Sequence, residues 1–217
     1  MKIYTIAILI AFFLIVGMLI FDADLANAKK DDSKKKKIEL CCTWGDSLDD
    51  GILTFSIDNG GSDLAKIVKL AITDWEKSLN KIEFKFVKNN DDADIEVEFK
   101  KGKGKKVGKT VTYFDPSGFI EQVDISISKK SYGVTLNSET LEHVAKHELG
   151  HALGLGHANY KNTLMSPNVD EIITKISACE IASVKYANSW KLGKDDNDGS
   201  PSPLDNEGFK CKKKQSS

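Results

Sequence analysis

The most constraining feature of this sequence is the stretch 147–157, which reads HELGHALGLGH. On a helix, His147 and His151 lie one turn apart on the same face, so both imidazoles can reach one metal ion. Gly154 can adopt the left-handed conformation that ends a helix, and the reversed chain then brings His157 round as a third ligand. Three histidine ligands leave one tetrahedral position open for water, as a catalytic zinc site requires.

The helix that carries this stretch is predicted to run from about residue 139 to 153, with Ser138 as its N-cap. Glu148 lies one position round from the first ligand, where its carboxylate can meet a metal-held water without being a ligand itself. A fourth histidine ligand would close the site, so we expect His143 to be a partly exposed or supporting residue. We expect Lys146 to lie on the solvated face.

The residues before this helix alternate between apolar and polar in several short runs, which is typical of half-buried strands. One longer stretch has apolar residues at helical spacing, and Trp75 within it is expected in the core. The order predicts an α+β fold with one twisted sheet packed on helices. The predicted strands are 53–57, 82–86, 95–99, 111–113 and 123–127, and the other helices are 64–79 and 177–190, the latter with a Ser177–Glu180 capping box.

The stretch HELGHALGLGH matches HExxHxxGxxH and so resembles the zinc signature of the metzincin metallopeptidases. The segment 163–167, TLMSP, fits the methionine turn of that clan, and its short gap from His157 and its Met-x-Pro pattern are similar to matrixins. The resemblance covers roughly residues 44–192. It implies a metzincin catalytic domain of the microbial minimal form, with a five-stranded mixed sheet packed on the active-site helix and two further helices.

This resemblance implies a zinc endopeptidase that hydrolyses internal peptide bonds of a protein or peptide substrate, and the N-terminal segment described below adds the expectation that it is exported. Glu148 is expected to take a proton from the water that zinc holds and to deliver it to the leaving amine. Met165 is expected beneath the metal as a packing platform. The single catalytic zinc ion is expected on His147, His151 and His157.

Substrate is expected to pair along an exposed sheet edge near Lys109–Tyr113, with Val111 and Thr112 as contact residues. Pro167, just after the methionine turn, is expected to line the substrate pocket that follows the cleaved bond. A calcium site is possible but not evident, and Lys100–Lys106 has no histidine for a structural zinc. We expect a monomer.

The N-terminus reads as a targeting segment. Ile3–Phe21 is an almost unbroken apolar run behind Lys2, and Ala26 and Ala28 are the small residues that signal peptidase accepts. The run is also nearly long enough to stay in a bilayer as an anchor. Either alternative places the remainder outside the cytoplasm, secreted or anchored to the outer face of the membrane.

The chain is therefore expected to have four parts, of which only one is a folded domain. A signal peptide or anchor is followed by a lysine-rich linker, the zinc peptidase domain and a flexible polar tail. Their ranges are 1–28, 29–43, 44–192 and 193–217.

Charge excludes one class of partner. All 31 basic residues are lysine, and the formal net charge is -1. Without arginine the chain has no bidentate readout of phosphate or guanine, and it has no excess of positive charge for a nucleic acid. We expect no nucleic-acid partner, and a membrane contact only through the N-terminal segment.

The four cysteines of an exported chain suggest disulfides. A bond between the adjacent Cys41 and Cys42 is geometrically strained, so we expect these two to pair with Cys179 and Cys211. An alternative is that Cys41 or Cys42 reaches the metal and keeps the protein latent.

Two other functions compete with a peptidase. One is a non-catalytic extracellular binding module that retains the metzincin fold, and the other is a zinc hydrolase for a different bond. Glu148 argues against the first, because a binding module needs no general base.

Overall fold

The computed structural model describes residues 35–88, 92–102, 104–169, 171–193 and 208–211. The expected signal peptide or anchor lies outside these residues. Within the described residues, no helix has the length and apolar character needed to cross a bilayer.

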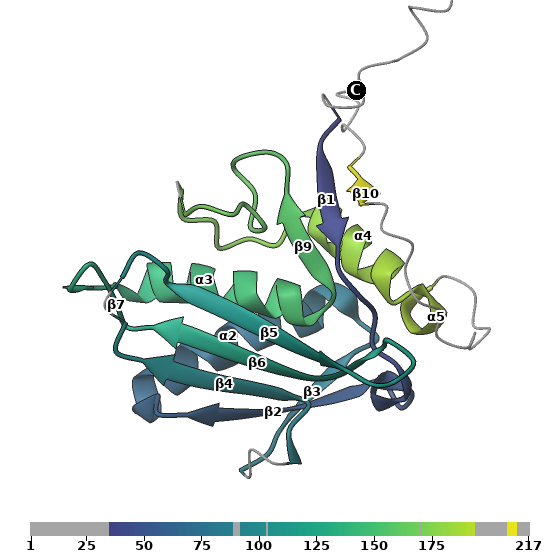
Figure 1. The fold of residues 1–217 in the computed structure, drawn as a ribbon, viewed down its shortest axis with the longest axis horizontal. Coiled ribbons are helices and arrows are strands. Elements are labelled where there is room, and N and C mark those ends of the chain that lie inside the picture. The colour runs from purple at the N-terminus through teal and green to yellow at the C-terminus, as the bar shows by residue number, and fades with distance from the viewer. Residues whose placement is uncertain (1–34, 89–91, 103, 170, 194–207, 212–217) are drawn as a thin grey trace, which may run out of the picture. The chain divides into compact units, whose positions relative to one another are not determined.

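A five-stranded mixed sheet forms the base of the domain, with helices α2 and α3 packed on one face (Figure 1). The strand order is β3-β2-β4-β6-β5, and only β5 at the edge runs antiparallel to its neighbour. This confirms the predicted α+β fold. The bounds are β2 Ile52–Asp58, α2 Gly61–Leu79, β3 Glu83–Phe86, β4 Ile95–Lys100, β5 Gly108–Phe114, β6 Ile120–Ser128 and α3 Ser138–Ala152.

Apolar periodicity explains why these residues form these elements. In β4, Ile95, Val97 and Phe99 are buried and alternate with partly or fully exposed residues, so one face of the strand lies in the core. In α2, the buried residues fall on one stripe that faces α3 and the sheet. Trp75 is fully buried on that stripe, as predicted, and its Nε1 donates a hydrogen bond to the Lys146 carbonyl at 3.0 Å.

A second, three-stranded sheet joins both ends of the described domain. Strand β1, Lys37–Leu40, lies between β9, Leu155–Ala158, and β10, Phe209–Lys210, and pairs antiparallel with both. The predicted linker and tail are therefore wrong at residues 37–43 and 208–211, which belong to the fold. The predicted linker and tail followed from the lysines of residues 29–37 and the polar composition of residues 193–217. Ile38 in β1 is nevertheless fully buried and supplies an apolar contact that holds the strand.

The remaining elements are short. A 3₁₀ turn precedes β2, a two-stranded hairpin precedes α3, and two helices close the domain. The predicted Ser177–Glu180 capping box is confirmed at the start of α4. Asn137, not Ser138, caps α3, because its side chain accepts from the Thr140 amide. The bounds are η2 Asp46–Leu48, β7 Lys130–Ser131, β8 Val134–Thr135, α4 Ala178–Ala187 and α5 Ser189–Leu192.

The disulfides differ from the expected pairing. Cys41 bonds to Cys42, and Cys179 bonds to Cys211. The Cys211 amide donates to the Lys36 carbonyl at one end of β1, whereas Cys41 follows the other end. The length of β1 therefore separates Cys211 from Cys41, and the start of α4 supplies its partner instead.

Candidate active site

Three histidines converge above the middle of the domain, as predicted. His147 and His151 project from one face of α3, and their Nε2 atoms lie 3.1 Å apart. His157 arrives from β9, with its ring centroid 4.8 Å from that of His151. One ligand atom from each of the three lies within 4.8 Å of the others. Nitrogen ligands of a tetrahedral zinc ion are about 3.3 Å apart, so the triad is close to the required spacing.

The turn that brings His157 to the site depends on Gly154. Its φ is +95°, and a Cβ at this position would overlap the Cys42 carbonyl oxygen. The helix therefore ends where the sequence predicts, and the chain reverses into β9. Strand β1 then fixes β9 through the register Leu40 to Leu155 and Ile38 to Ala158.

Hydrogen bonds to backbone carbonyls set the tautomers of the two helical ligands. His147 Nδ1 donates to the Leu164 carbonyl at 2.6 Å, and His151 Nδ1 donates to the Leu155 carbonyl at 2.7 Å. A carbonyl can only accept, so the ring proton is on Nδ1 and each Nε2 carries a lone pair. Two facing lone pairs repel unless a cation lies between them. This donor set fits zinc.

Burial keeps these rings neutral. It lowers the pKa of His147 to about 3, with the neighbouring His151 and His157 adding to the decrease. The pKa of His151 and that of His157 are also lowered, mainly by burial. Neutral imidazole is the form that ligates a metal, so the site is ready for an ion across the physiological pH range.

Met165 packs against α3, the helix that carries two of the histidines. It is fully buried, and a Cβ on Gly150 of α3 would come within 2.5 Å of its sulfur, so the methionine packs directly against the helix. Glu180 of α4 holds this turn from below: it accepts hydrogen bonds from the Leu164 amide at 2.8 Å and from the Thr163 hydroxyl. Leu164 in turn accepts from His147, so the turn connects α4 to the first ligand.

Glu148 is buried beside the triad and contacts the edge strand β5. Thr110 Oγ1 donates to its Oε2 at 2.6 Å, and a Cβ on Gly108 would overlap its Oε1. Burial raises the pKa of Glu148 to about 7, although the Thr110 hydrogen bond and the charge of Lys106 both act to lower it. A carboxylate with this pKa can accept and return a proton near neutral pH.

The three predicted substrate contacts lie on two different elements. Val111 and Thr112 are half-buried in β5, whose outer edge has no strand partner among the described residues. Pro167 is exposed two residues after Met165. Their contact with substrate stays a prediction.

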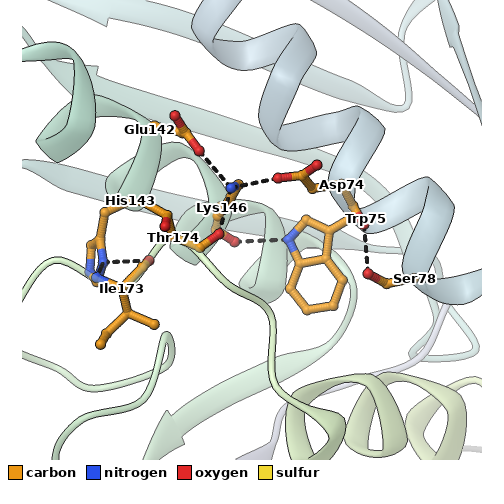
Figure 2. Close-up of polar contacts among 8 residues, drawn as sticks. All are labelled: Asp74, Trp75, Ser78, Glu142, His143, Lys146, Ile173 and Thr174. Carbon is orange, nitrogen blue, oxygen red and sulfur yellow. Dashed lines mark hydrogen bonds and ion pairs between the residues drawn. The ribbon is translucent and has the colours of Figure 1, made fainter.

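The preceding turn of α3 corrects two expectations (Figure 2). Lys146 is not solvated: it is 1% exposed and its Nζ lies 2.6 Å from Asp74 of α2, from Glu142 and from the Thr174 carbonyl. His143 is also buried; the Ile173 amide donates to its Nδ1 at 2.8 Å, and the Ile173 carbonyl lies 2.9 Å from the same atom. Glu142 is a local partner of Lys146, four residues earlier on α3. The other partners come from α2 and from the segment before α4, which no local pattern around α3 reveals.

Sequence reasoning missed three supporting residues of the site. Gly108 lay between the lysine-rich segment Lys100–Lys106 and the expected edge Lys109–Tyr113, Thr110 lay in that edge with no assigned role, and Glu180 was assigned only to a helix cap. One available signal was the glycine at the start of an apolar strand, which often marks the close approach of another group. No sequence pattern indicates that Glu180 both caps α4 and accepts hydrogen bonds from the turn that contains Met165.

Comparison with known proteins decides the family. A family model described as Matrixin matches residues 47–185. The chain belongs to the matrixin family. It therefore has a zinc metallopeptidase fold, with a histidine triad able to hold the metal. No curated protein sequence matches the chain.

Three solved structures are similar to this chain at low sequence identity. A chain from the GM1-bound form of the ECX AB5 holotoxin is 14% identical, with a TM-score of 0.50 over 71% of this chain and 89% of that one. Myroilysin is 22% identical with a TM-score of 0.37, over 53% of this chain and 46% of that one. Archaemetzincin from Methanopyrus kandleri is 15% identical with a TM-score of 0.43, over 63% and 94%.

Proposed function

We propose that this matrixin-family protein is an exported zinc endopeptidase in which Glu148 is the general base. The observation that carries the proposal is the position of Glu148. It is buried next to three histidines, and contacts Gly108 and Thr110 of the edge strand on which a substrate would lie. A non-catalytic module would need neither the carboxylate nor its hydrogen bond.

Each residue then has a defined part in hydrolysis. His147, His151 and His157 would hold zinc, which when bound supplies a Lewis acid and acidifies a water. Glu148 Oε accepts a proton from that water and returns it to the nitrogen of the leaving amine. Thr110 keeps the carboxylate oriented through its hydrogen bond to Oε2.

The edge of β5 orients the peptide. Its outward N–H and C=O groups can pair with an extended substrate, which would place the cleaved bond over Glu148. Because main-chain pairing does not depend on sequence, it suits internal bonds of polypeptides rather than a small molecule.

The test is a digestion of casein and of a quenched-peptide pool by the zinc-loaded chain, with zinc quantified. Glu148→Ala and a chelator-treated sample are the controls. We expect cleavage that falls at least about 100-fold in Glu148→Ala while zinc content is unchanged. Stoichiometric zinc without cleavage of any peptide would contradict a peptidase and favour the binding module.

Export is the second part of this proposal. The apolar run Ile3–Phe21 and the two disulfides suit a chain that folds in an oxidising compartment. Fractionation of the producing cells tests it: the mature chain should be in the medium or on the outer membrane face. Recovery in the cytoplasm with free thiols would contradict export.

A further inference from the structure

Two segments at the edge of the sheet contain lysines and no acidic residue; the first includes the edge strand β5. Residues 99–114 contain six lysines, residues 125–138 contain two, and neither contains Asp or Glu. The chain as a whole is nearly neutral, so this is a local concentration of positive charge. The catalytic scheme above does not use it.

The fold places the two segments side by side, at the end of the sheet where β4 ends and β5 begins (Figure 1). The Lys129 amide donates to the Lys100 carbonyl at 2.8 Å, and the Tyr132 amide donates to the Gly104 carbonyl at 3.2 Å. Strand β4 and the β7–β8 hairpin therefore form one surface. We call its exposed members, Lys101, Lys105, Lys106, Lys109 and Lys130, the lysine surface.

The lysine surface adjoins the candidate active site. Lys106 precedes Gly108, the residue that contacts Glu148, by two positions. A polypeptide that pairs with β5 and continues past Gly108 would thus run onto the lysine surface.

The hairpin beside it exposes apolar side chains. Tyr132 is 72% exposed and Val134 is 69% exposed. Tyr132 and Gly133 form the two-residue turn of the hairpin, with φ values of +47° and +82°, and this turn holds the tyrosine at the tip. An aromatic ring and lysine side chains at one end of a substrate-binding edge can contact a polypeptide through both its backbone and its charges.

We propose that the lysine surface binds an acidic stretch of the protein substrate, so that favoured cleavage sites carry Asp or Glu on one side of the cleaved bond. The inference rests on the proposed peptidase function and adds the substrate class. A site edge lined by one sign of charge concentrates ligands of the opposite sign. No acidic side chain within the two segments competes for these lysines.

The test compares matched quenched peptides with the zinc-loaded full chain. Each peptide contains the cleavage site found in casein and either three Glu or three Gln, two residues from the cleaved bond on one side or the other. The variant combines Lys101→Gln, Lys105→Gln and Lys130→Gln. The control combines Lys77→Gln, Lys85→Gln and Lys88→Gln, which are equally exposed on α2 and on and after β3 at the far edge of the sheet.

We expect kcat/KM for one Glu peptide to exceed that of its Gln counterpart about 5- to 20-fold at low salt. The ratio should fall to about two-fold in the variant and in 0.5 M salt, and persist in the control. Cleavage of the Gln peptides should be the same for all three proteins. Equal turnover of Glu and Gln peptides by the wild type would overturn the inference and leave the peptidase function intact.

Two further measurements separate the alternatives. If no peptide is cleaved, the peptidase function fails, and fluorescence anisotropy of the labelled peptides decides the inference. Tighter binding of a Glu peptide that is lost in the variant supports the surface, and equal binding overturns it. Sedimentation with phosphatidylserine vesicles that is lost in the variant, together with no preference among peptides, would overturn it in favour of a membrane surface.

Discussion

Two neighbouring stretches of helix α3 contain the same kinds of residue but make different contacts. In the stretch 147–151, His147, His151 and Glu148 converge around a position for a metal. In the stretch 142–146, Lys146 and His143 contact α2 and the segment before α4 (Figure 2). The contacts of the first stretch can be predicted from the spacing of a few adjacent residues. Those of the second depend mainly on partners far away in the sequence.

His143 and His147 make the comparison sharp, because they are one helical turn apart and their rings stack at 6.4 Å. His147 Nδ1 donates to the Leu164 carbonyl, whereas His143 Nδ1 accepts from the Ile173 amide at 2.8 Å and lies 2.9 Å from the Ile173 carbonyl. Nε2 of His147 faces a second histidine, whereas Nε2 of His143 is buried with no partner among the described residues. Burial alone therefore does not make a histidine a metal ligand. Its Nε2 must also face other ligand atoms, as Nε2 of His147 faces that of His151.

The largest expected effect is on zinc binding, which should require the triad residue His151 but not His143. His151→Ala should remove zinc and lower kcat/KM by at least about 1,000-fold, because two ligands cannot hold the ion in catalytic geometry. His143→Ala should retain one zinc per chain, measured by atomic emission after dialysis. Loss of zinc in His143→Ala would show that the comparison is wrong and that the site has four histidine ligands.

The next effect concerns the charge of Glu148 in the metal-free chain. Because burial raises the pKa of this carboxyl to about 7, the folded state holds its proton more tightly than the unfolded state. The wild type should therefore lose stability relative to Glu148→Gln as pH rises from about 4.5 to about 7, by roughly 2–3 kcal/mol. Urea unfolding of both proteins at each pH measures the difference.

The comparison with Glu148→Gln is needed because the histidines also make stability depend on pH. The pKa of His147 is lowered, so its contribution to stability is lost as pH falls below about 6.5, the opposite direction. Since both proteins contain these histidines, the difference between them isolates Glu148. A difference that does not change with pH would contradict the raised pKa.

In the stretch 142–146 of α3, Lys146→Met should cost about 1–3 kcal/mol of unfolding free energy. It leaves Asp74 and Glu142 without their cation, and both are only partly buried, which limits the loss. Burial alone would lower the pKa of Lys146, but the two carboxylates raise it, so the lysine is charged. Lys77→Met on exposed α2 is the control, and unchanged stability in Lys146→Met would mean that desolvation cancels the ion pairs.

The smallest effect tests the support of the general base. Thr110→Val removes the hydrogen bond that stabilises the ionised form of Glu148. The acidic limb of the kcat/KM profile should move to higher pH by less than about one unit, because the base is then protonated at a higher pH. A shift to lower pH would contradict this role of Thr110.

Sequence alone could predict the residues whose chemistry is local. The triad, Glu148 and the left-handed Gly154 follow from spacing, Met165 follows from the resemblance to matrixins, and the strands and helices follow from apolar periodicity. It could not predict that Lys146 is buried, because the ion pair that permits burial requires Asp74 on another helix. The disulfide pairing failed for the same reason, since strand β1 lay in a predicted linker and its length could not be taken into account.

Strand β10 has a consequence for the order in which this chain can mature. His157 lies on β9, β9 pairs with β1, and β1 pairs with β10 and borders Cys211. The three-stranded sheet thus joins segments at opposite ends of the domain, which form late because their loop closes only after most of the chain is available. During synthesis, the strand that carries the third ligand gains its complete support only when Phe209–Lys210 has emerged. Before that point, the first two histidines of the triad already have their helix, whereas the third lies on a strand whose partner β1 is still unpaired along one edge.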